Sequence, residues 1–199
     1  MVKNFEETVM YKKGKLGECL IDKKILSADK FIPYAPVGDC AHPFDRICAS
    51  KDKKKLMVLE VKTISARQKY PDTGISIKHY YEYLHIQDKY QLPVYIAFVD
   101  GYLRKIYGNK LDELRKPIEI VHKGKTISYP KIEENFTAVG GKIIYFPLLN
   151  MTTIHELADD EAEELERYSN YGYKRDLSHK KGYNKWLEKR EELSSYYSY

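Results

Sequence analysis

The sequence predicts an α/β fold with a central mixed β-sheet, flanking helices and a C-terminal helical appendage. Three observations support this fold class. Residues 15–26 carry apolar side chains at helical spacing. Residues 44–49, 56–64 and 94–99 are rich in the apolar and β-branched residues of strands. A second helical segment lies between the last two of these strands. The expected order is therefore helix, three-stranded meander, helix and strand.

The meander is expected to begin with residues 31–37, whose two prolines favour an edge strand. A short strand over 44–49 and a longer one over 56–64 follow. The lysine-rich residues 50–55 between them are too polar for a core and have the length of a hairpin loop. We therefore expect the two strands to pair in antiparallel fashion.

A turn over 71–74 precedes the second helix, which is expected over 76–90 with Ser76 as its N-cap. The residues expected on its inner stripe are Ile77, Tyr80, Tyr81 and Leu84. Pro93 follows the helix, and the apolar run over 94–99 is continuous enough to be buried on both faces of the sheet.

Strands over 102–107 and 142–147, separated by a charged connection, are expected to extend the sheet. An acidic helix is expected over about 153–168, followed by a tail rich in tyrosine and lysine. We therefore divide the chain into an α/β domain over 1–150 and a helical extension over 151–199. This extension would pack on the core or on a partner.

Composition excludes several classes of protein. No apolar run in the 199 residues approaches the roughly 18 that cross a bilayer, so no membrane association is expected. The first 25 residues carry charges throughout, and the three cysteines lack the paired spacing of a zinc site, which favours a cytoplasmic protein with reduced thiols. The absence of a glycine-rich phosphate loop argues against ATP-driven chemistry. The net charge of +5 is compatible with a polyanionic partner.

Three charged residues fall on the predicted hairpin. Asp45 lies at the start of its first strand, and Glu60 and Lys62 lie two apart on the second, so these two point to the same face. Leu59 and Val61 indicate that this strand is not a solvated ribbon. Half-buried charges without partners are costly. A divalent cation would compensate both carboxylates, and Mg²⁺ prefers such oxygen ligands, with a backbone carbonyl as a further one.

Lys62 would have a separate task beside the metal. An ammonium group can orient or help deprotonate an attacking water, and it can offset negative charge that grows on a phosphoryl group during attack. Carboxylates alone would repel a phosphodiester.

These residues resemble the signature of the PD-(D/E)XK nuclease superfamily, which includes restriction endonucleases, Holliday-junction resolvases and recombination exonucleases. The matching elements are Pro43-Phe44-Asp45 and, after fourteen intervening residues, Glu60-Val61-Lys62. The resemblance covers the first half of the chain and implies the same order of elements as expected above. Phe44, between the proline and the aspartate, departs from the usual motif.

The resemblance implies specific roles. Asp45 and Glu60 would be metal ligands with the Val61 carbonyl as a possible third, and Lys62 would be the catalytic lysine. Glu18, on the helix before the meander, matches an acidic residue that many members contribute to catalysis and metal binding. The alternative is that Glu60 and Lys62 are exposed residues of an edge strand and that Asp45 caps a turn.

The resulting hypothesis is a Mg²⁺-dependent endonuclease, with Mn²⁺ as a substitute, that acts on nucleic acid, DNA rather than RNA. The size of the chain is compatible with a homodimer. Its expected nucleic-acid contacts are Lys53, Lys54, Lys78 and Tyr80, although a solvated loop and core packing explain these residues as well. Two other functions remain open. One is a non-catalytic nucleic-acid-binding module on the same fold, and the other is an assembly protein that uses the C-terminal extension.

Overall fold

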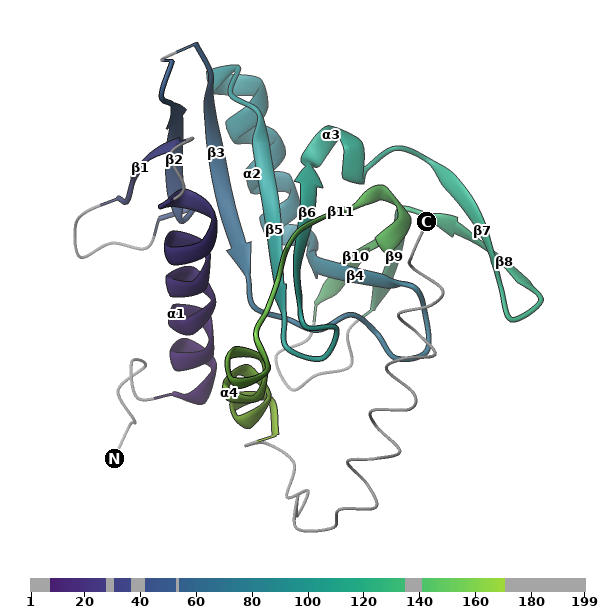
Figure 1. Cartoon of the computed structure of the whole chain (residues 1–199). Coiled ribbons are helices and arrows are strands. Elements are labelled where there is room, and N and C mark those ends of the chain that lie inside the picture. The colour runs from purple at the N-terminus through teal and green to yellow at the C-terminus, as the bar shows by residue number, and fades with distance from the viewer. Residues whose placement is uncertain (1–7, 28–30, 37–41, 53, 135–140, 171–199) are drawn as a thin grey trace, which may run out of the picture.

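A six-stranded mixed sheet forms the centre of the molecule (Figure 1). The computed structural model describes residues 8–27, 31–36, 42–52, 54–134 and 141–170. The strands of this sheet, in spatial order, are β1 (Phe31–Tyr34), β2 (Arg46–Ser50), β3 (Leu56–Lys62), β5 (Val94–Asp100), β6 (Lys105–Lys110) and β11 (Thr152–Glu156). β3 and β5 are parallel and the other neighbours are antiparallel. The predicted mixed sheet and its antiparallel meander β1–β2–β3 are confirmed.

Helices cover both faces of this sheet (Figure 1). On one face lie α1 (Val9–Ile21), its π-helical continuation η2 (Asp22–Leu26) and α4 (Asp159–Asn170). On the other lie α2 (Ile77–Tyr90) and the short α3 (Leu111–Leu114). No helix among the described residues has the length and apolar character needed to cross a membrane.

β5 separates the two halves of the core because its alternate side chains point to opposite faces. Ala97 and Val99 pack with the α1 and α4 side, whereas Ile96 and Phe98 pack with the α2 side. All four are at most 1% exposed. The prediction that this strand is buried on both faces is confirmed.

α1 begins earlier than the sequence predicts, at Val9 rather than near residue 15. The Thr8 hydroxyl accepts a hydrogen bond from the Tyr11 N–H and so caps the first turn. Leu20 and Ile21 bury their side chains against the sheet.

Gly17 allows α1 to lie directly on the end of β3. A Cβ at this position would collide with the Thr63 hydroxyl, whereas a Cβ at Gly14 would meet no atom within 4 Å. We therefore expect Gly17→Ala to lower the free energy of unfolding by about 1 to 3 kcal/mol through overpacking. The control Gly14→Ala should raise it by up to about 1 kcal/mol through helix propensity. Urea unfolding measures both, and equal effects of the two variants would contradict the close packing.

A second, three-stranded sheet contains β4 (Asp72–Ser76), β10 (Lys142–Pro147) and β9 (Lys131–Glu134). The turn predicted over 71–74 is therefore wrong, because these residues lead into a strand paired with β10. Gly74 reads locally as a turn residue, but its missing side chain lets the β10 backbone pass closely. The prediction that 142–147 extends the main sheet is also wrong. β10 instead pairs on both edges within the second sheet and packs against α2.

The charged segment after β6, which was expected only to connect two strands, forms a short helix and three strands of its own. It includes α3, the strands β7 (Ile118–His122) and β8 (Lys125–Tyr129), and β9. β7 and β8 form a two-stranded ribbon that projects from the body (Figure 1). β6 itself begins at Lys105 rather than at residue 102, because the Asp100 carboxylate accepts a hydrogen bond from the Leu103 N–H and holds a turn there.

The segment after residue 150 departs from the predicted helix. A 3-10 turn, η3 (Leu148–Asn150), leads into β11, which pairs with β6 at the edge of the main sheet. The helix expected over 153–168 therefore starts only at Asp159. The first residues of the expected extension thus complete the main sheet, and the tail over 171–199 lies outside the described residues.

Two of the three cysteines lie in the described part of the chain, and both are free thiols. Cys48 is buried in β2, and burial raises the pKa of its thiol to about 11. Cys40 lies outside the described residues. A structural role in the core fits Cys48 better than a reactive one.

Candidate active site

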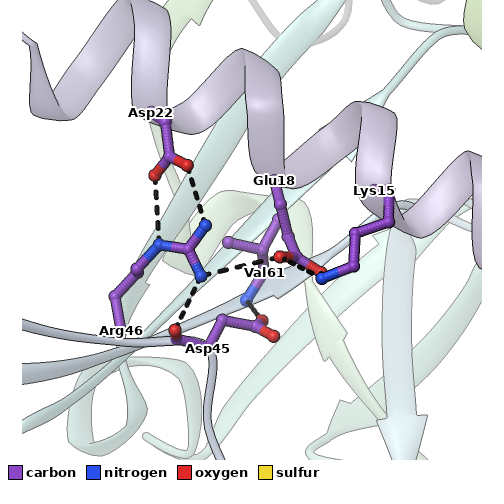
Figure 2. A network of polar contacts seen from close by, with 6 residues as sticks. All are labelled: Lys15, Glu18, Asp22, Asp45, Arg46 and Val61. Carbon is purple, nitrogen blue, oxygen red and sulfur yellow. Dashed lines mark hydrogen bonds and ion pairs between the residues drawn. The ribbon is translucent and has the colours of Figure 1, made fainter. Parts of the chain in front are cut away.

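Asp45 lies where β2 and β3 separate. The two strands pair only as far as Arg46 and Leu59, so the Val61 N–H has no partner on the β2 backbone. It donates instead to the Asp45 carboxylate, with 2.7 Å between Val61 N and Asp45 Oδ2 (Figure 2). Because the N–H and C=O of a strand residue point to the same side, the Val61 carbonyl also faces the Asp45 side of β3.

Glu60 and Lys62 share the face of β3 that packs toward α2, as their spacing predicts. β3 is an interior strand and Glu60 is only 6% exposed, so the reading of these residues as exposed positions of an edge strand is wrong. The Lys62 ammonium donates a hydrogen bond to Oε1 of Glu60. Oε2 of Glu60 is buried, and no hydrogen bond of normal length and angle reaches it from the described residues, although the Tyr83 hydroxyl interacts with this carboxyl group.

The two carboxylates are close enough to influence one another. Burial raises the pKa of Asp45 to about 6, and the negative charge of Glu60 contributes to the same rise. The Val61 N–H and the Lys62 ammonium oppose the rise without cancelling it. Two carboxylates in this position call for a further positive charge.

Tyr83 of α2 packs against the Glu60–Lys62 pair. The Lys62 Nζ lies 5.8 Å from the centroid of its ring, and Tyr83 is 1% exposed. The pKa of its phenol is raised, first by burial and then by the charge of Glu60. Tyr83 therefore limits the positions that the pair can adopt.

His79 lies one turn before Tyr83 on the same helix, with 6.2 Å between the ring centroids. Its pKa is lowered by partial burial and by the charge of Lys62. The sequence predicts Lys78 and Tyr80 of this helix as nucleic-acid contacts but does not single out Tyr83. The four-residue spacing of His79 and Tyr83 puts both on one helix face, which is the signal that points to Tyr83.

Glu18, Asp22 and Arg46 form a polar network on the α1 side of Asp45 (Figure 2). The Arg46 guanidinium donates to both carboxylate oxygens of Asp22, at 2.7 and 3.2 Å, and to the Asp45 carbonyl at 2.7 Å. Glu18 is paired with Lys15 at 3.0 Å and with Arg46 at 3.5 Å. Arg46 thus ties α1 to the backbone that carries Asp45, a role that the sequence analysis did not assign.

We expect Arg46→Ala to lower the free energy of unfolding by about 1 to 3 kcal/mol, because it removes charge-assisted hydrogen bonds that are largely buried at the arginine. Removal of the partly exposed ion pair by Lys24→Ala, which separates Lys24 from Glu161, should cost less than about 1 kcal/mol. A positioning role for Arg46 would also reduce the rise in melting temperature caused by Mg²⁺. An Arg46→Ala protein with the full Mg²⁺ response would show that Asp45 needs no support from α1.

The donor chemistry at this site fits a hard divalent cation. Asp45 and Glu60 supply carboxylate oxygens, one of them buried without a hydrogen bond of normal geometry, and the Val61 carbonyl faces the same side as the Asp45 carboxylate. Among residues 8–27, 31–36, 42–52, 54–134 and 141–170, no group of three or more His, Cys, Asp and Glu side chains is arranged to hold a metal. The groups that fit a divalent cation are therefore the Asp45 and Glu60 carboxylates and the Val61 carbonyl. Glu18 remains a predicted ligand, and its carboxylate is paired with Lys15 and Arg46.

The predicted nucleic-acid contacts lie in different places. Lys54 is exposed in the β2–β3 loop, at the opposite end of these strands from Asp45, and Lys53 lies outside the described residues. Lys78 is 80% exposed on α2. Tyr80 lies in a groove between α2 and α3. Tyr81, expected on the inner stripe of the helix, is 60% exposed, so that prediction is wrong.

No family model matches the chain, and no curated protein matches it. Among solved structures, the fold is similar to that of Hjc from Archaeoglobus fulgidus, a Holliday junction resolvase. The match has 13% sequence identity and a TM-score of 0.44, and it covers 77% of this chain and 96% of that chain. A likeness this weak assigns no activity, so the function has to be inferred from the side chains of this chain.

Proposed function

We propose that this protein is a divalent-metal-dependent nuclease that hydrolyses phosphodiester bonds in DNA. Asp45 and Glu60 would hold the metal with the Val61 carbonyl, and Lys62 would act on the reacting groups. Glu18 would contribute from α1. Mg²⁺ is the expected ion, with Mn²⁺ as a substitute.

The observation that carries the proposal is the meeting of Asp45, Glu60 and Lys62 at one point of the sheet. Glu60 and Lys62 occupy a face of β3 that otherwise packs in the core. A purely structural strand would place apolar side chains there, since a buried carboxylate with an oxygen that lacks a hydrogen bond of normal geometry destabilises the fold. Such a cost is typical of functional sites.

A bound divalent ion would supply Lewis acidity toward a phosphate oxygen and lower the pKa of a bound water. The protein groups have separate tasks. The Lys62 ammonium is held by Glu60 and lies against the Tyr83 ring, so it enters the reaction already oriented. From there it can orient the attacking water and offset the charge that develops on the phosphate oxygens as the water oxygen bonds to phosphorus and the ester oxygen leaves.

Asp45 is oriented from two sides. Its carboxylate accepts from the Val61 N–H, and its carbonyl accepts from Arg46. These contacts fix the position of Asp45 relative to Glu60. The bond from the Val61 N–H reaches Oδ2 only, so it does not occupy the other carboxylate oxygen of Asp45. Pre-organisation of this kind reduces the entropy lost when substrate and metal bind.

The test is cleavage of plasmid, linear and branched DNA by the purified full chain with Mg²⁺ or Mn²⁺. We expect wild type to cut and Lys62→Ala to lose roughly a hundredfold or more of the rate, by analogy with the loss of one charge-stabilising donor. Lys89→Ala removes an exposed lysine at the end of α2 and should leave the rate unchanged. Identical products from wild type and Lys62→Ala would show that this site does not cut DNA.

A further inference from the structure

The β7–β8 ribbon ends in a cationic tip. Residues 120–129, which include the turn between β7 and β8, contain Lys123 and Lys125 and no acidic residue, whereas Glu119 lies nearer the base of the ribbon. Neither Lys123 nor Lys125 forms an ion pair with another described residue, and both are exposed. The ribbon projects away from the sheets, so its tip is accessible to a large partner (Figure 1).

The backbone at this tip is held in an unfavourable conformation. Lys123 and Gly124 have φ of 51° and 74°, and they join the paired residues His122 and Lys125. A two-residue turn with both central φ positive favours Asn, Asp or Gly at its first position. A lysine there costs about 1 to 2 kcal/mol. The turn places the Lys123 side chain at the exposed tip of the ribbon.

An open groove of about 450 Å³ lies at the base of the same ribbon. Pro117 and Pro130, which flank the two strands, line it together with Tyr80, Asp112, Arg115 and Lys116. The two cations are paired with acidic residues of α3, Arg115 with Asp112 at 3.0 Å and Lys116 with Glu113. Both are about half exposed or more, so these pairs are weak enough to exchange for a phosphate.

α2 connects this groove to the candidate active site. Tyr83 packs against Glu60 and Lys62, and Tyr80, three residues earlier, faces the groove. Residues three apart on a helix are about 5 to 6 Å apart at their Cβ atoms. The groove and the candidate active site therefore both border α2.

We propose that the groove and the β7–β8 ribbon bind a double-stranded arm of the nucleic acid whose backbone is cut at Asp45, Glu60 and Lys62. This inference rests on the proposed function and adds the surface that holds the substrate. Arg115 and Lys116 meet phosphates at the base, and Lys123 and Lys125 meet them at the tip. A two-stranded ribbon has the width to enter the major groove of a duplex.

A second copy of the chain is a poorer occupant of this surface. Stable interfaces bury more than about 1,000 Å² and have an apolar centre. Within the described ribbon, Val121 is the one large apolar side chain that is exposed. Lysines without ion pairs at the tip suit a polyanion better.

The experiment measures binding of a fluorescein-labelled DNA duplex by anisotropy, in EDTA and over a series of NaCl concentrations. The test variant is Lys123→Ala/Lys125→Ala, and Lys12→Ala/Lys89→Ala removes the same charge from exposed positions of α1 and α2. We expect the test variant to bind roughly ten- to a hundredfold more weakly near 0.1 M salt. The slope of log K against log salt should fall by about 2, with the control close to wild type. Unchanged affinity and slope would overturn the inference.

Two further readouts separate this inference from the proposed function. If wild type binds through the ribbon but does not cut with any metal, the inference stands and the proposed nuclease activity fails. If wild type cuts DNA and the ribbon variant keeps the wild-type affinity, salt dependence of binding and KM, the inference fails but the proposed nuclease activity stands. Loss of a dimer in sedimentation, with DNA affinity unchanged, would assign the ribbon to a second copy and overturn the inference.

Discussion

Replacement of Asp45 by asparagine is expected to abolish cleavage and, without metal, to stabilise the fold above about pH 6. Cleavage falls because a metal ligand is lost. Stability rises because the wild-type carboxylate must ionise in a buried position beside Glu60, which asparagine avoids. The asparagine oxygen can still accept the Val61 N–H. Thermal unfolding in EDTA at several pH values measures the effect.

The sign of the pH dependence follows from the pKa of Asp45, which rises from an ordinary 3.8 to about 6 on folding. The folded state binds this proton more tightly than the unfolded state. The wild type therefore carries the full cost, of order 3 kcal/mol, above about pH 6 and none of it well below pH 3.8. The advantage of Asp45→Asn should shrink as the pH falls between these values.

Mg²⁺ should reverse the order of the two proteins. It binds the folded wild type and raises its melting temperature, whereas Asp45→Asn should respond weakly. Asp52→Asn is the matched control, because the pKa of this exposed carboxyl is lowered by its hydrogen bonds to Ser50 and Lys54. It should give no gain in stability at neutral pH. If Asp45→Asn were less stable than wild type in EDTA near pH 8, the claim that the ionised Asp45 carboxylate destabilises the metal-free fold would be wrong.

Replacement of Asp100 by alanine is expected to cause the largest loss of stability, about 3 to 5 kcal/mol. Asp100 is fully buried at the end of β5. Its carboxylate accepts hydrogen bonds from the Ala66 N–H at 2.7 Å, the Leu103 N–H at 2.9 Å and the Tyr107 hydroxyl at 2.9 Å. Alanine would leave these donors, two of them fully buried, without the carboxylate that accepts their hydrogen bonds. Chemical unfolding measures the loss.

Asp112→Ala is the control for this prediction. Its carboxylate is about half exposed and paired with Arg115, so its removal should cost less than about 1 kcal/mol. Because Ala66 follows shortly after Lys62 in the chain, Asp100→Ala should also slow cleavage. A loss of less than about 1 kcal/mol for Asp100→Ala would contradict the prediction, because it would mean that water accepts the hydrogen bonds in place of the carboxylate.

The part of the fold predicted from sequence is the part with local signals. The hairpin β2–β3 has a polar loop of suitable length, and β5 has an unbroken apolar run. The spacing of Glu60 and Lys62 places both on one face whatever the rest of the chain does. These features carry the candidate site, which is why its centre could be predicted.

The other elements depend on contacts between distant residues. β4 forms because β10, some seventy residues later, pairs with it, and Gly74 alone signals a turn. β11 forms because β6 offers a free edge to Thr152 and its neighbours. A strand that exists only through its partner leaves little trace in its own sequence.

The residues around the site were missed for the same reason. Arg46 reaches Asp22 across twenty-four positions of sequence, and Tyr83 meets Lys62 only because α2 packs on that face of the sheet. Neither contact follows from spacing. Tyr80 lines the groove between α2 and α3, a position that its place in the sequence does not indicate.

The most direct measurement of the central claim is anomalous diffraction from crystals of the full chain soaked in MnCl₂. The proposed site predicts a manganese peak between the side chains of Asp45 and Glu60, within bonding distance of both carboxylates and lost in Asp45→Asn. Binding of manganese elsewhere, with these two carboxylates free of metal at saturating concentration, would contradict it.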